Sequence, residues 1–302
     1  MAVDWVVRTP AVAENDPELA RARAARLPTF FRGEVLPELL SGHTSVAVCG
    51  THGKTTTTTF ITQMLRTTGR DPSWCIGGEN LALGGVAGVG QGGFMVVEAD
   101  ESDGTLALYR PDIAVVTNIE FDHMEHFASV SAFENCFRTF IGNARRKVVY
   151  CSEDPRAAAL CRGNPKAVSY GFCPGAAVRG AGLKLTDSSL SFILHARGRR
   201  QGVIELPAPG RHNALNALAA AAVGLELGLS FGEIRRALKK VSLPRRRFEK
   251  VVEKGGVLVM SDYAHHPTEV AVTLKAVREK YPQRQIWCVF QPHQYQRTYY
   301  LF

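Results

Sequence analysis

Residues 45–56 read SVAVCGTHGKTT, an apolar run that leads into a glycine-containing turn and a Gly-Lys-Thr triplet. The alternating valines, with small residues between them, predict a buried parallel strand. Gly50 and Gly53 allow the backbone to turn sharply and to bring its N–H groups close to an anion. We therefore predict a strand, an anion-binding loop, and a helix over residues 56–65 whose N-terminus faces the same anion.

The loop departs in one position from the usual phosphate-loop pattern, which separates a first glycine from the Gly-Lys pair by four residues. Val48 stands where that first glycine belongs, so the shorter form Gly-x-x-Gly-Lys-Thr remains. The alternative interpretation is a glycine-rich turn before a threonine-rich helix. Because Gly-Lys-Thr directly follows an apolar strand, phosphate binding is favoured, with Lys54 on the outer phosphates and the Thr55 hydroxyl on Mg²⁺.

Length and composition indicate a globular protein of about two domains. The chain has 302 residues, of which 45% are hydrophobic and 21% are charged. It has no apolar run near the roughly 20 residues of a membrane span, and residues 1–10 lack a basic segment followed by an apolar one. We therefore predict neither membrane insertion nor a secretory signal. The seven cysteines form no Cys-x-x-Cys pair, which favours reduced thiols in a cytoplasm over disulfides or a zinc site.

The net charge of +8 comes from several basic clusters, at residues 145–147, 197–200, 235–240 and 245–247. A nucleic-acid partner is one interpretation of such clusters. No stripe of basic and aromatic residues and no recognised reader motif accompanies them. We therefore predict no nucleic-acid binding, and attribute the excess to solvated faces and to attraction for a polyanionic small substrate.

A second apolar run ends in acids, since residues 94–103 read FMVVEADESD. This pattern predicts a buried strand that delivers carboxylates to its C-terminal end. Mg²⁺ prefers one or two carboxylates together with phosphate oxygens and water. Glu98 is nearest the strand end and is the first choice of ligand. A solvated acidic loop is the alternative interpretation, which applies well to Glu101 and less clearly to Asp103.

A third run, residues 113–123, reads IAVVTNIEFDH and has the same design. His123, beside Asp122 at the strand end, is a candidate ligand for a metal or a phosphate. Open α/β sheets place ligands at the carboxyl ends of their strands. The three runs therefore predict polar tips that meet at one crevice.

The rest of the chain predicts alternating helices and strands, with a change of character at Leu243-Pro244 that suggests a domain boundary. The strand at the start and the short segment at the end lack enough neighbours to complete a sheet, so we expect a domain that begins before this sequence and another that continues beyond it. The expected elements are strands at 3–8, 147–151, 257–261 and 285–290; helices at 16–25, 129–142, 155–162, 213–227 and from about 268; a strand and helix within 27–40; glycine-rich loops over 77–80 and 84–93; and an antiparallel section over 166–206.

Asn213 and Asn216 lie one turn apart on one face of the alanine-rich helix. An amide offers both a donor and an acceptor, which suits the edge of an adenine ring. A helix cap made by Asn213 is an equally good interpretation of the same residues.

Seven motifs in order resemble those of the Mur ligases, and the resemblance covers nearly the whole chain. The motifs lie at residues 50–56, 98–103, 117–123, 210–216, 246–249, 262–267 and 291–293. The resemblance implies an α/β fold with a central, mostly parallel sheet of the P-loop type flanked by helices and a partial Rossmann-like C-terminal domain. It divides the chain into 1–42, the remnant of a UDP-binding domain with a linker; 43–243, the central ATP-binding domain; and 244–302, part of the ligase domain.

The resemblance also implies an activity, the ATP-dependent joining of L-alanine to the carboxylate of UDP-N-acetylmuramate in peptidoglycan precursor synthesis. ATP and Mg²⁺ are the implied cofactors, and an acyl phosphate is the implied intermediate. The resemblance implies that the nucleotide is bound by Gly50, Thr51, His52, Gly53, Lys54, Thr55, Thr56, Asn213, Asn216 and Asp262. It implies that one metal ion is bound by Thr55 and Glu98 and a second by His123. It further implies that Lys54, His123 and Arg247 take part in catalysis and that His265 and His293 contact the substrates.

Two other functions stay open: a related ligase that attaches a recycled murein peptide to the same sugar acid, and an inactive ATP-binding fragment. Because the sugar-binding domain is expected to be absent, we expect weak Mg–ATP binding and poor ligation from these 302 residues alone. We also expect Lys54 to be exposed in its loop. Its replacement by alanine would then remove nucleotide turnover with little loss of folding.

Overall fold

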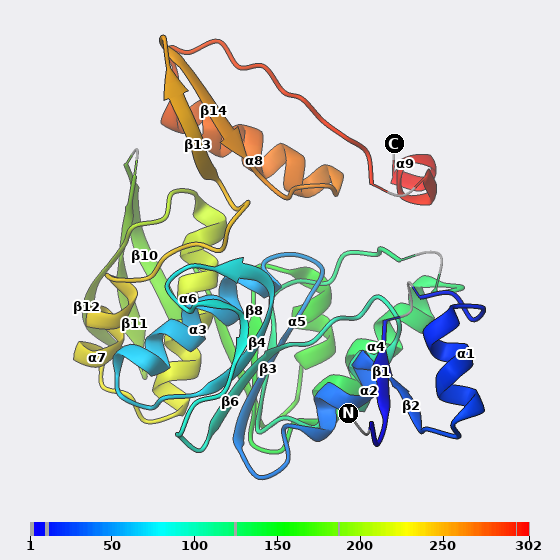
Figure 1. Ribbon diagram of the computed structural model, residues 1–302. Helices are drawn as coiled ribbons and strands as arrows, with labels where there is room; N and C mark the ends of the chain where they lie inside the picture. Colours follow the sequence, from blue (N-terminus) through cyan, green and yellow to red (C-terminus); the bar gives the residue numbers. More distant parts are fainter. Residues whose placement is uncertain (1–2, 10–11, 124–125, 187, 294, 302) are drawn as a thin grey trace.

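A ten-stranded sheet forms the centre of the computed structural model, which describes residues 3–9, 12–123, 126–186, 188–293 and 295–301 (Figure 1). The strand order is β12-β11-β10-β9-β8-β7-β3-β6-β4-β5, and the strands from β10 to β4 are parallel. The sheet comprises β3 (Thr44–Cys49), β4 (Ser73–Asn80), β5 (Gly85–Gly88), β6 (Phe94–Glu98), β7 (Ile113–Val116), β8 (Lys147–Cys151), β9 (Ala167–Gly171), β10 (Val178–Leu185), β11 (Leu190–Ala196) and β12 (Arg199–Leu206).

Strand β3 lies between β7 and β6, and both of its faces are buried. Val46 and Val48 belong to the core on one side of the sheet, whereas Ala47 and Cys49 belong to the core on the other. Side chains alternate between the faces of a strand, so an apolar run is what a strand covered on both sides requires. The predicted α/β class, with a mostly parallel sheet flanked by helices, is confirmed.

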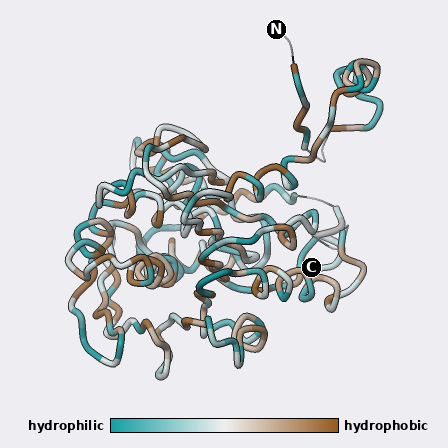
Figure 2. Tube along the Cα trace, turned by 90° about the horizontal axis from the view of Figure 1, so that it is seen from below, coloured by the Kyte–Doolittle hydropathy of each residue, from teal (hydrophilic) through white to brown (hydrophobic). Residues whose placement is uncertain are grey.

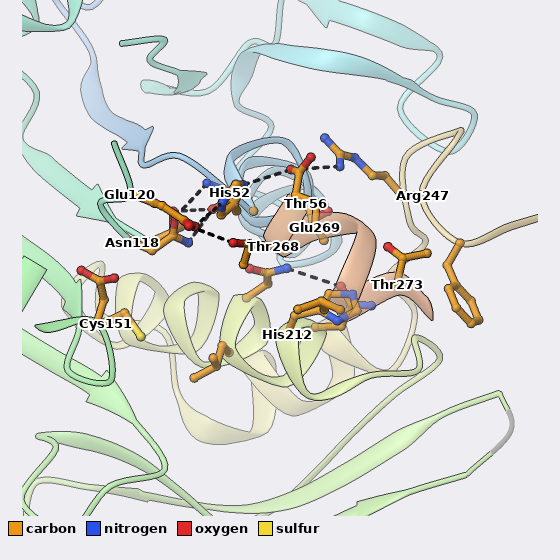
Figure 3. Close-up of a pocket in the computed structure, with 18 of the residues that line it drawn as sticks. His52, Thr56, Asn118, Glu120, Cys151, His212, Arg247, Thr268, Glu269 and Thr273 are labelled. Carbon is orange, nitrogen blue, oxygen red and sulfur yellow. Dashed lines mark hydrogen bonds and ion pairs between the residues drawn. The ribbon is translucent and has the colours of Figure 1, made fainter. Parts of the chain in front are cut away.

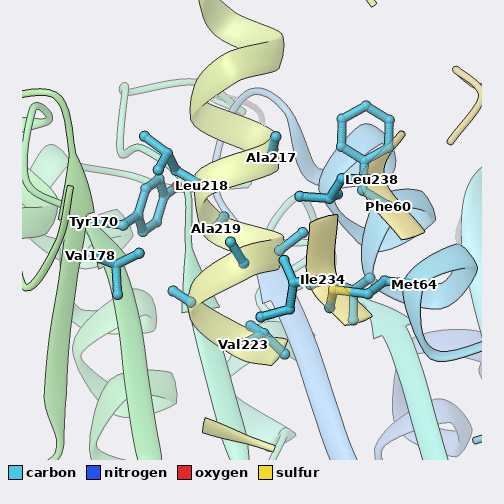
Figure 4. Packing of buried hydrophobic residues seen from close by; sticks show 14 of the residues in the cluster. Phe60, Met64, Tyr170, Val178, Ala217, Leu218, Ala219, Val223, Ile234 and Leu238 are labelled. Atoms are coloured by element: carbon cyan, nitrogen blue, oxygen red, sulfur yellow. The ribbon is translucent and has the colours of Figure 1, made fainter. Parts of the chain in front are cut away.

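One face of the sheet is covered by α3 (Lys54–Thr67), α6 (Arg211–Glu226) and α7 (Phe231–Leu238) (Figure 4). The alanines of α6 are fully buried, and their small side chains let α6 lie close to α3. Phe60 and Met64 of α3 fill the space between these helices together with Ile234 of α7. This packing fixes the direction of α3 and therefore the position of the loop before it.

The threonine-rich start of α3 is helical although β-branched residues have low helix propensity. The hydroxyls of Thr58, Thr59 and Thr62 donate to the carbonyl oxygens four residues earlier, at 2.8, 2.7 and 2.8 Å. These bonds satisfy hydroxyls that the helix buries against the sheet. Tertiary packing thus outweighs intrinsic propensity here.

The opposite face of the sheet carries α4 (Val130–Asn143) and α5 (Pro155–Cys161). Ser129 and Asp154 cap these helices by accepting from backbone N–H groups three residues later. The helix η1 (Thr105–Leu108) packs against α4. Phe133, Phe137 and Phe140 of α4 are fully buried against the sheet.

Both ends of the chain form smaller units beside the main body (Figures 1 and 2). The N-terminal unit pairs β1 (Val6–Arg8) in parallel with β2 (Thr29–Phe31) and adds α1 (Pro17–Ala24) and α2 (Arg32–Glu38). The C-terminal segment pairs β13 (Glu249–Lys254) with β14 (Val257–Ser261) and adds α8 (Pro267–Lys280) and α9 (Tyr295–Leu301). Among the described residues, no helix has both the length and the apolar character needed to cross a bilayer.

Two expected elements are wrong. Residues 77–80 and 84–93 are expected in loops, but residues 77–80 belong to β4 and residues 85–88 form β5. Glycine is required at position 77 of β4, because a Cβ there would come within 2.7 Å of a Glu98 oxygen. Residues 285–290 were expected to form a strand but have no regular structure. No described strand pairs with them, and the side chains of Trp287, Cys288 and Val289 are exposed.

We predict that Gly50→Ala lowers the free energy of unfolding by at least about 2 kcal/mol, because φ is +129° and a Cβ would lie 2.1 Å from Oγ1 of Thr117. Gly69→Ala is the matched control, since Gly69 also has positive φ (+74°) but open space around it, and should cost only about 1 kcal/mol. Urea unfolding of both variants measures the difference. Equal losses would show that the contact with Thr117 contributes nothing.

Candidate functional site

The loop between β3 and α3 is held in place by the residues that follow β7. The N–H groups of Thr51 and His52 donate to Asn118, to its backbone oxygen at 3.1 Å and to Oδ1 at 2.8 Å. Asn118 Nδ2 and the Thr117 hydroxyl both donate back to the carbonyl oxygen of His52, at 2.9 and 2.6 Å. Two loop N–H groups are therefore used by the scaffold.

The donors aimed at an anion lie at the start of α3. The first intrahelical bond runs from Thr57 N to Gly53 O, so the N–H groups of residues 54–56 precede the helical ladder. Gly53 has φ +81°, and a Cβ there would lie 2.8 Å from Oδ1 of Asn216. The predicted anion-binding geometry of a glycine turn and a helix N-terminus is present.

Lys54 is not exposed, contrary to expectation. Its Nζ donates to both carboxylate oxygens of Glu101, at 2.8 and 2.9 Å, and the Lys54 side chain is only 13% exposed. Burial by itself lowers the pKa of Lys54, but Glu101, Asp100 and Glu98 outweigh burial and the pKa is raised, so the ammonium keeps its charge.

Glu101 is correspondingly not part of a solvated acidic loop, because its side chain is fully buried. Its backbone also accepts from Gly104 N, which closes the turn after β6. Lys54 is the positive charge that makes this burial tolerable. A buried carboxylate paired with the phosphate-loop lysine is the main feature of the site that the sequence did not reveal.

The oxygen ligands predicted for Mg²⁺ lie together. The Thr55 hydroxyl is 3.2 Å from Oε1 of Glu98, and Gly77 N donates to the other Glu98 oxygen at 2.7 Å. One hydroxyl and one carboxylate beside a phosphate-binding loop fit the preference of Mg²⁺ for oxygen donors. The residues present therefore fit the implied ion.

His123 lies in a different group, with Asp100 and Glu101. Donor atoms of these three residues all lie within 4.8 Å of one another, and His123 Nε2 is 3.9 Å from a Glu101 oxygen. Burial by itself raises the pKa of Asp100, but Lys54 and the Ser102 N–H outweigh it and the net pKa is lowered. Of the candidate metal ligands, Thr55 and Glu98 therefore lie in one group and His123 in another.

Two cavities meet at the phosphate loop. The larger, about 690 Å³, contains Thr51, Lys54, Thr55, Glu98, His123, His265 and His293 among its lining residues. The smaller, about 300 Å³, contains Thr56, Cys151, Asn213, Asn216 and Asp262 (Figure 3). His52, Gly53, Arg247 and Glu269 line both cavities, so the two cavities adjoin at these residues.

Asn213 does not cap its helix, so that alternative is wrong. Gly210 is the N-cap of α6, and Asn213 lies in the first turn with Nδ2 donating to Pro209 O at 2.6 Å. Asn216 Nδ2 lies 3.4 Å from Oδ1 of Asn213, and Asn216 Oδ1 accepts from Thr57 Oγ1 at 3.1 Å. Both amides therefore have fixed orientations at the wall of the smaller cavity.

His212 lines the same cavity, although the sequence pattern did not indicate it as a site residue. Burial lowers its pKa to about 4, so the imidazole is neutral at pH 7. Cys151 also lines this cavity, and burial raises the pKa of its thiol to about 11. The smaller cavity therefore presents neutral side chains over part of its wall, which suits an uncharged heterocycle.

The candidate site residues Arg247, Asp262, His265 and His293 belong to the C-terminal segment and line the two cavities. Asp262 accepts from the N–H groups of Phe248 and Ala264, both at 2.8 Å, and so fixes the backbone beside Arg247. Arg247 Nη1 lies 3.9 Å from Oε1 of Glu269. The rings of His265 and His293 lie with centroids 5.7 Å apart at the wall of the larger cavity.

Glu269, His266 and Glu120 are further site residues that sequence reasoning missed. His266 is the N-cap of α8, and Glu269 accepts from the N–H groups of His265 and His266, which completes a capping box. The usual signature of that box starts with serine or threonine, so the pattern His-x-x-Glu gave only a weak signal. Glu120 follows β7 and accepts from the Thr268 hydroxyl at 2.8 Å.

Comparison with known proteins shows the family. Residues 48–224 match the Mur ligase middle domain, and residues 246–299 match the Mur ligase glutamate ligase domain. The first match alone extends over more than half of the chain. The chain belongs to the Mur ligase family.

Individual relatives show which members of the family this chain resembles. The chain is 41% identical to the UDP-N-acetylmuramate--L-alanine ligase of Solidesulfovibrio magneticus and 40% identical to that of Desulfatibacillum aliphaticivorans, each over 99% of this chain and 66% of the relative. The crystal structure of UDP-N-acetylmuramate-alanine ligase from Thermotoga maritima matches with a TM-score of 0.86 and 30% identity, over 96% of this chain and 67% of that one. The chain thus spans about two thirds of the length of these relatives.

We predict that Lys54→Ala lowers the free energy of unfolding by about 3 kcal/mol, because it leaves the carboxylate of Glu101 buried without its partner. The double variant Lys54→Met/Glu101→Gln removes both charges and should recover most of that loss. Thermal or urea unfolding of the variants without nucleotide measures this. A single variant as stable as the wild type would mean that the ion pair contributes nothing to folding.

Proposed function

We propose that this chain carries the ATP-binding and amide-forming part of a ligase that joins L-alanine to the carboxylate of UDP-N-acetylmuramate. The observation that carries the proposal is identity of about 40%, over 99% of the chain, to relatives named for that reaction. The arrangement of Lys54, Thr55 and Glu98 beside an anion-binding helix start supports it.

In this proposal the nucleotide lies across the two cavities. Asn213 and Asn216 hold the adenine in the smaller one, and the phosphates pass His52 and Gly53 to the start of α3. Lys54 holds positive charge where the transferred phosphoryl group gains negative charge. Mg²⁺ would be held by Thr55 and Glu98, with His123 near a second ion, and it would screen the charge of the phosphates.

Gly50, Thr51 and Thr56 complete the nucleotide-binding loop in the proposal. Arg247 and Asp262 reach the nucleotide from the C-terminal segment, and His265 and His293 face the substrates in the larger cavity. The substrate carboxylate takes the γ-phosphoryl group of ATP, and the amine of alanine then displaces phosphate. We further propose the division into 1–42, 43–243 and 244–302 as parts of three domains, and a cytoplasmic location.

A second candidate is the attachment of a recycled murein peptide to the same sugar acid. The crystal structure of a murein peptide ligase from Psychrobacter arcticus has the same fold, with a TM-score of 0.75 at 22% identity. In the same comparison of structures the Thermotoga maritima alanine ligase has the higher TM-score, 0.86, and the higher identity, 30%, which favours alanine. A direct comparison of the two amine substrates separates these candidates.

ADP release with Mg–ATP, UDP-N-acetylmuramate and L-alanine, omitting each in turn, tests the proposed function. We expect release that requires all three, at a low rate for these 302 residues alone, because the segments present in longer relatives are lacking from the assay. The double variant Lys54→Met/Glu101→Gln is the control, since it should fold but not turn over nucleotide. ADP release that ignores alanine and sugar, or that persists in the control, would contradict the proposal.

We predict that Glu98→Gln raises the Mg²⁺ concentration for half-maximal nucleotide binding by at least about tenfold, because an amide oxygen is a weaker ligand than a carboxylate. Glu205→Gln is the matched control, since the Glu205 side chain is 58% exposed and forms a surface ion pair with Lys239. Mg²⁺ titration followed by binding of a fluorescent ATP analogue measures both. Equal Mg²⁺ requirements would exclude Glu98 as a ligand.

A further inference from the structure

The imidazole of His52 lies between two carboxylates that come from different parts of the chain. Its Nε2 is 2.9 Å from Glu120, which follows β7, and its Nδ1 is 3.2 Å from Glu269 on α8. The His52 side chain is 16% exposed and that of Glu269 is 12% exposed. One side chain of the phosphate loop thus contacts the main body and the C-terminal segment together.

Two neighbouring contacts strengthen the connection between α8 and the main body around His52. The Thr268 hydroxyl donates to Glu120 at 2.8 Å, and the ring of His266 lies 4.8 Å from that of His52 between centroids. His266 is 3% exposed. We call His52, Glu120, His266, Thr268 and Glu269 the His52 junction. Through it the first turn of α8 is fastened to the phosphate loop and the end of β7.

The chemistry of imidazole decides the charge state of this junction. Neutral imidazole has one N–H and donates to one carboxylate, whereas imidazolium donates to both. Burial by itself lowers the pKa of His52, but the hydrogen bond to Glu120 and the carboxylate of Glu269 at 3.2 Å outweigh burial and raise the pKa to about 9. Within the junction, the pKa of His266 is lowered by burial and then by His52. The other titratable groups that face the junction are Arg247, His265 and Asp122.

Helix α8 also fixes the residues proposed to reach ATP. Its Glu269 lies 3.9 Å from Arg247, and its Thr273 hydroxyl is 3.3 Å from Oδ1 of Asp262. The position of α8 therefore determines where both groups lie relative to the nucleotide cavity.

We propose that His52 is a positioning residue, which as imidazolium joins Glu120 to Glu269 and thereby holds the C-terminal segment where Arg247 and Asp262 face the nucleotide. The effect on ATP binding rests on the proposed function, because it assumes that Arg247 and Asp262 contact ATP. The contact itself is testable without any nucleotide.

The test follows amide hydrogen exchange of the first turn of α8, beginning at Val270 N, by rapid-quench exchange between pH 6 and 10. Dividing by the exchange of buried α6 amides in the same sample removes the intrinsic pH dependence. Because the folded pKa of His52 is raised, its contribution is complete below about pH 6.5, the ordinary value, and is lost as the pH rises through about 9. We expect relative protection of α8 to fall at least about tenfold over that window.

Three variants complete the test. His52→Gln and Glu269→Gln should lower the protection of α8 at pH 7 and abolish the fall above it. Glu253→Gln should keep the wild-type profile, because Glu253 forms two surface ion pairs of the same segment, with Lys250 and Arg284, away from the junction. The proposal would be overturned if the relative protection of α8 in the wild type stayed constant up to pH 10, or if His52→Gln showed the same fall in protection as the wild type. The pH titration of the wild type tests the proposal even if a variant fails to fold.

Affinity for a non-hydrolysable ATP analogue at pH 7 tests the positioning role. We expect Glu269→Gln to weaken it several-fold, and Glu253→Gln to leave it unchanged. Unchanged affinity in Glu269→Gln would overturn the positioning role. Wild-type protein that shows the pH-dependent contact but binds no analogue would count against the proposed function and not against the junction.

Discussion

Asn118 and the backbone of residues 51–52 exchange hydrogen bonds, and the remainder of the site depends on this exchange. The side-chain amide of Asn118 both accepts from and donates to His52, so the loop after β3 and the loop after β7 are locked in one relative position. Because two loop N–H groups are used in this way, the anion is left to the first turn of α3. The start of α3 is in turn fixed by the packing of that helix against the alanines of α6.

The locked loop brings opposite charges into a small volume. Lys54, Glu101, Asp100 and His123 form one cluster of charged groups, and His52, Glu120 and Glu269 form another. Lys54 lies beside Glu101, and His52 lies between Glu120 and Glu269, so both basic side chains already have acidic partners before any ligand arrives. A polyanion that enters must compete with these carboxylates for Lys54 and Arg247, and divalent cations lower the cost of that competition.

The sequence predicted the parts of this site that local pattern encodes. Three apolar runs that end in polar residues identified β3, β6 and β7, and with them Lys54, Glu98 and His123. The burial of Glu101 could not be predicted from local pattern, because it depends on a lysine 47 positions away and not on the acidic neighbours of Glu101. Glu269 was missed because its role arises only when α8 lies against His52. The strand expected at 285–290 failed for a related reason, since an apolar run forms a strand only beside another strand.

Cys151 at the wall of the smaller cavity has a consequence for chemical labelling. Only the thiolate reacts readily with electrophiles, and burial raises the pKa of this thiol to about 11. Alkylating reagents at neutral pH should therefore modify the exposed Cys288 and spare the cavity cysteine. Labelled protein would keep the smaller cavity unmodified, so Cys288 offers an attachment point for a fluorophore that reports on the C-terminal segment.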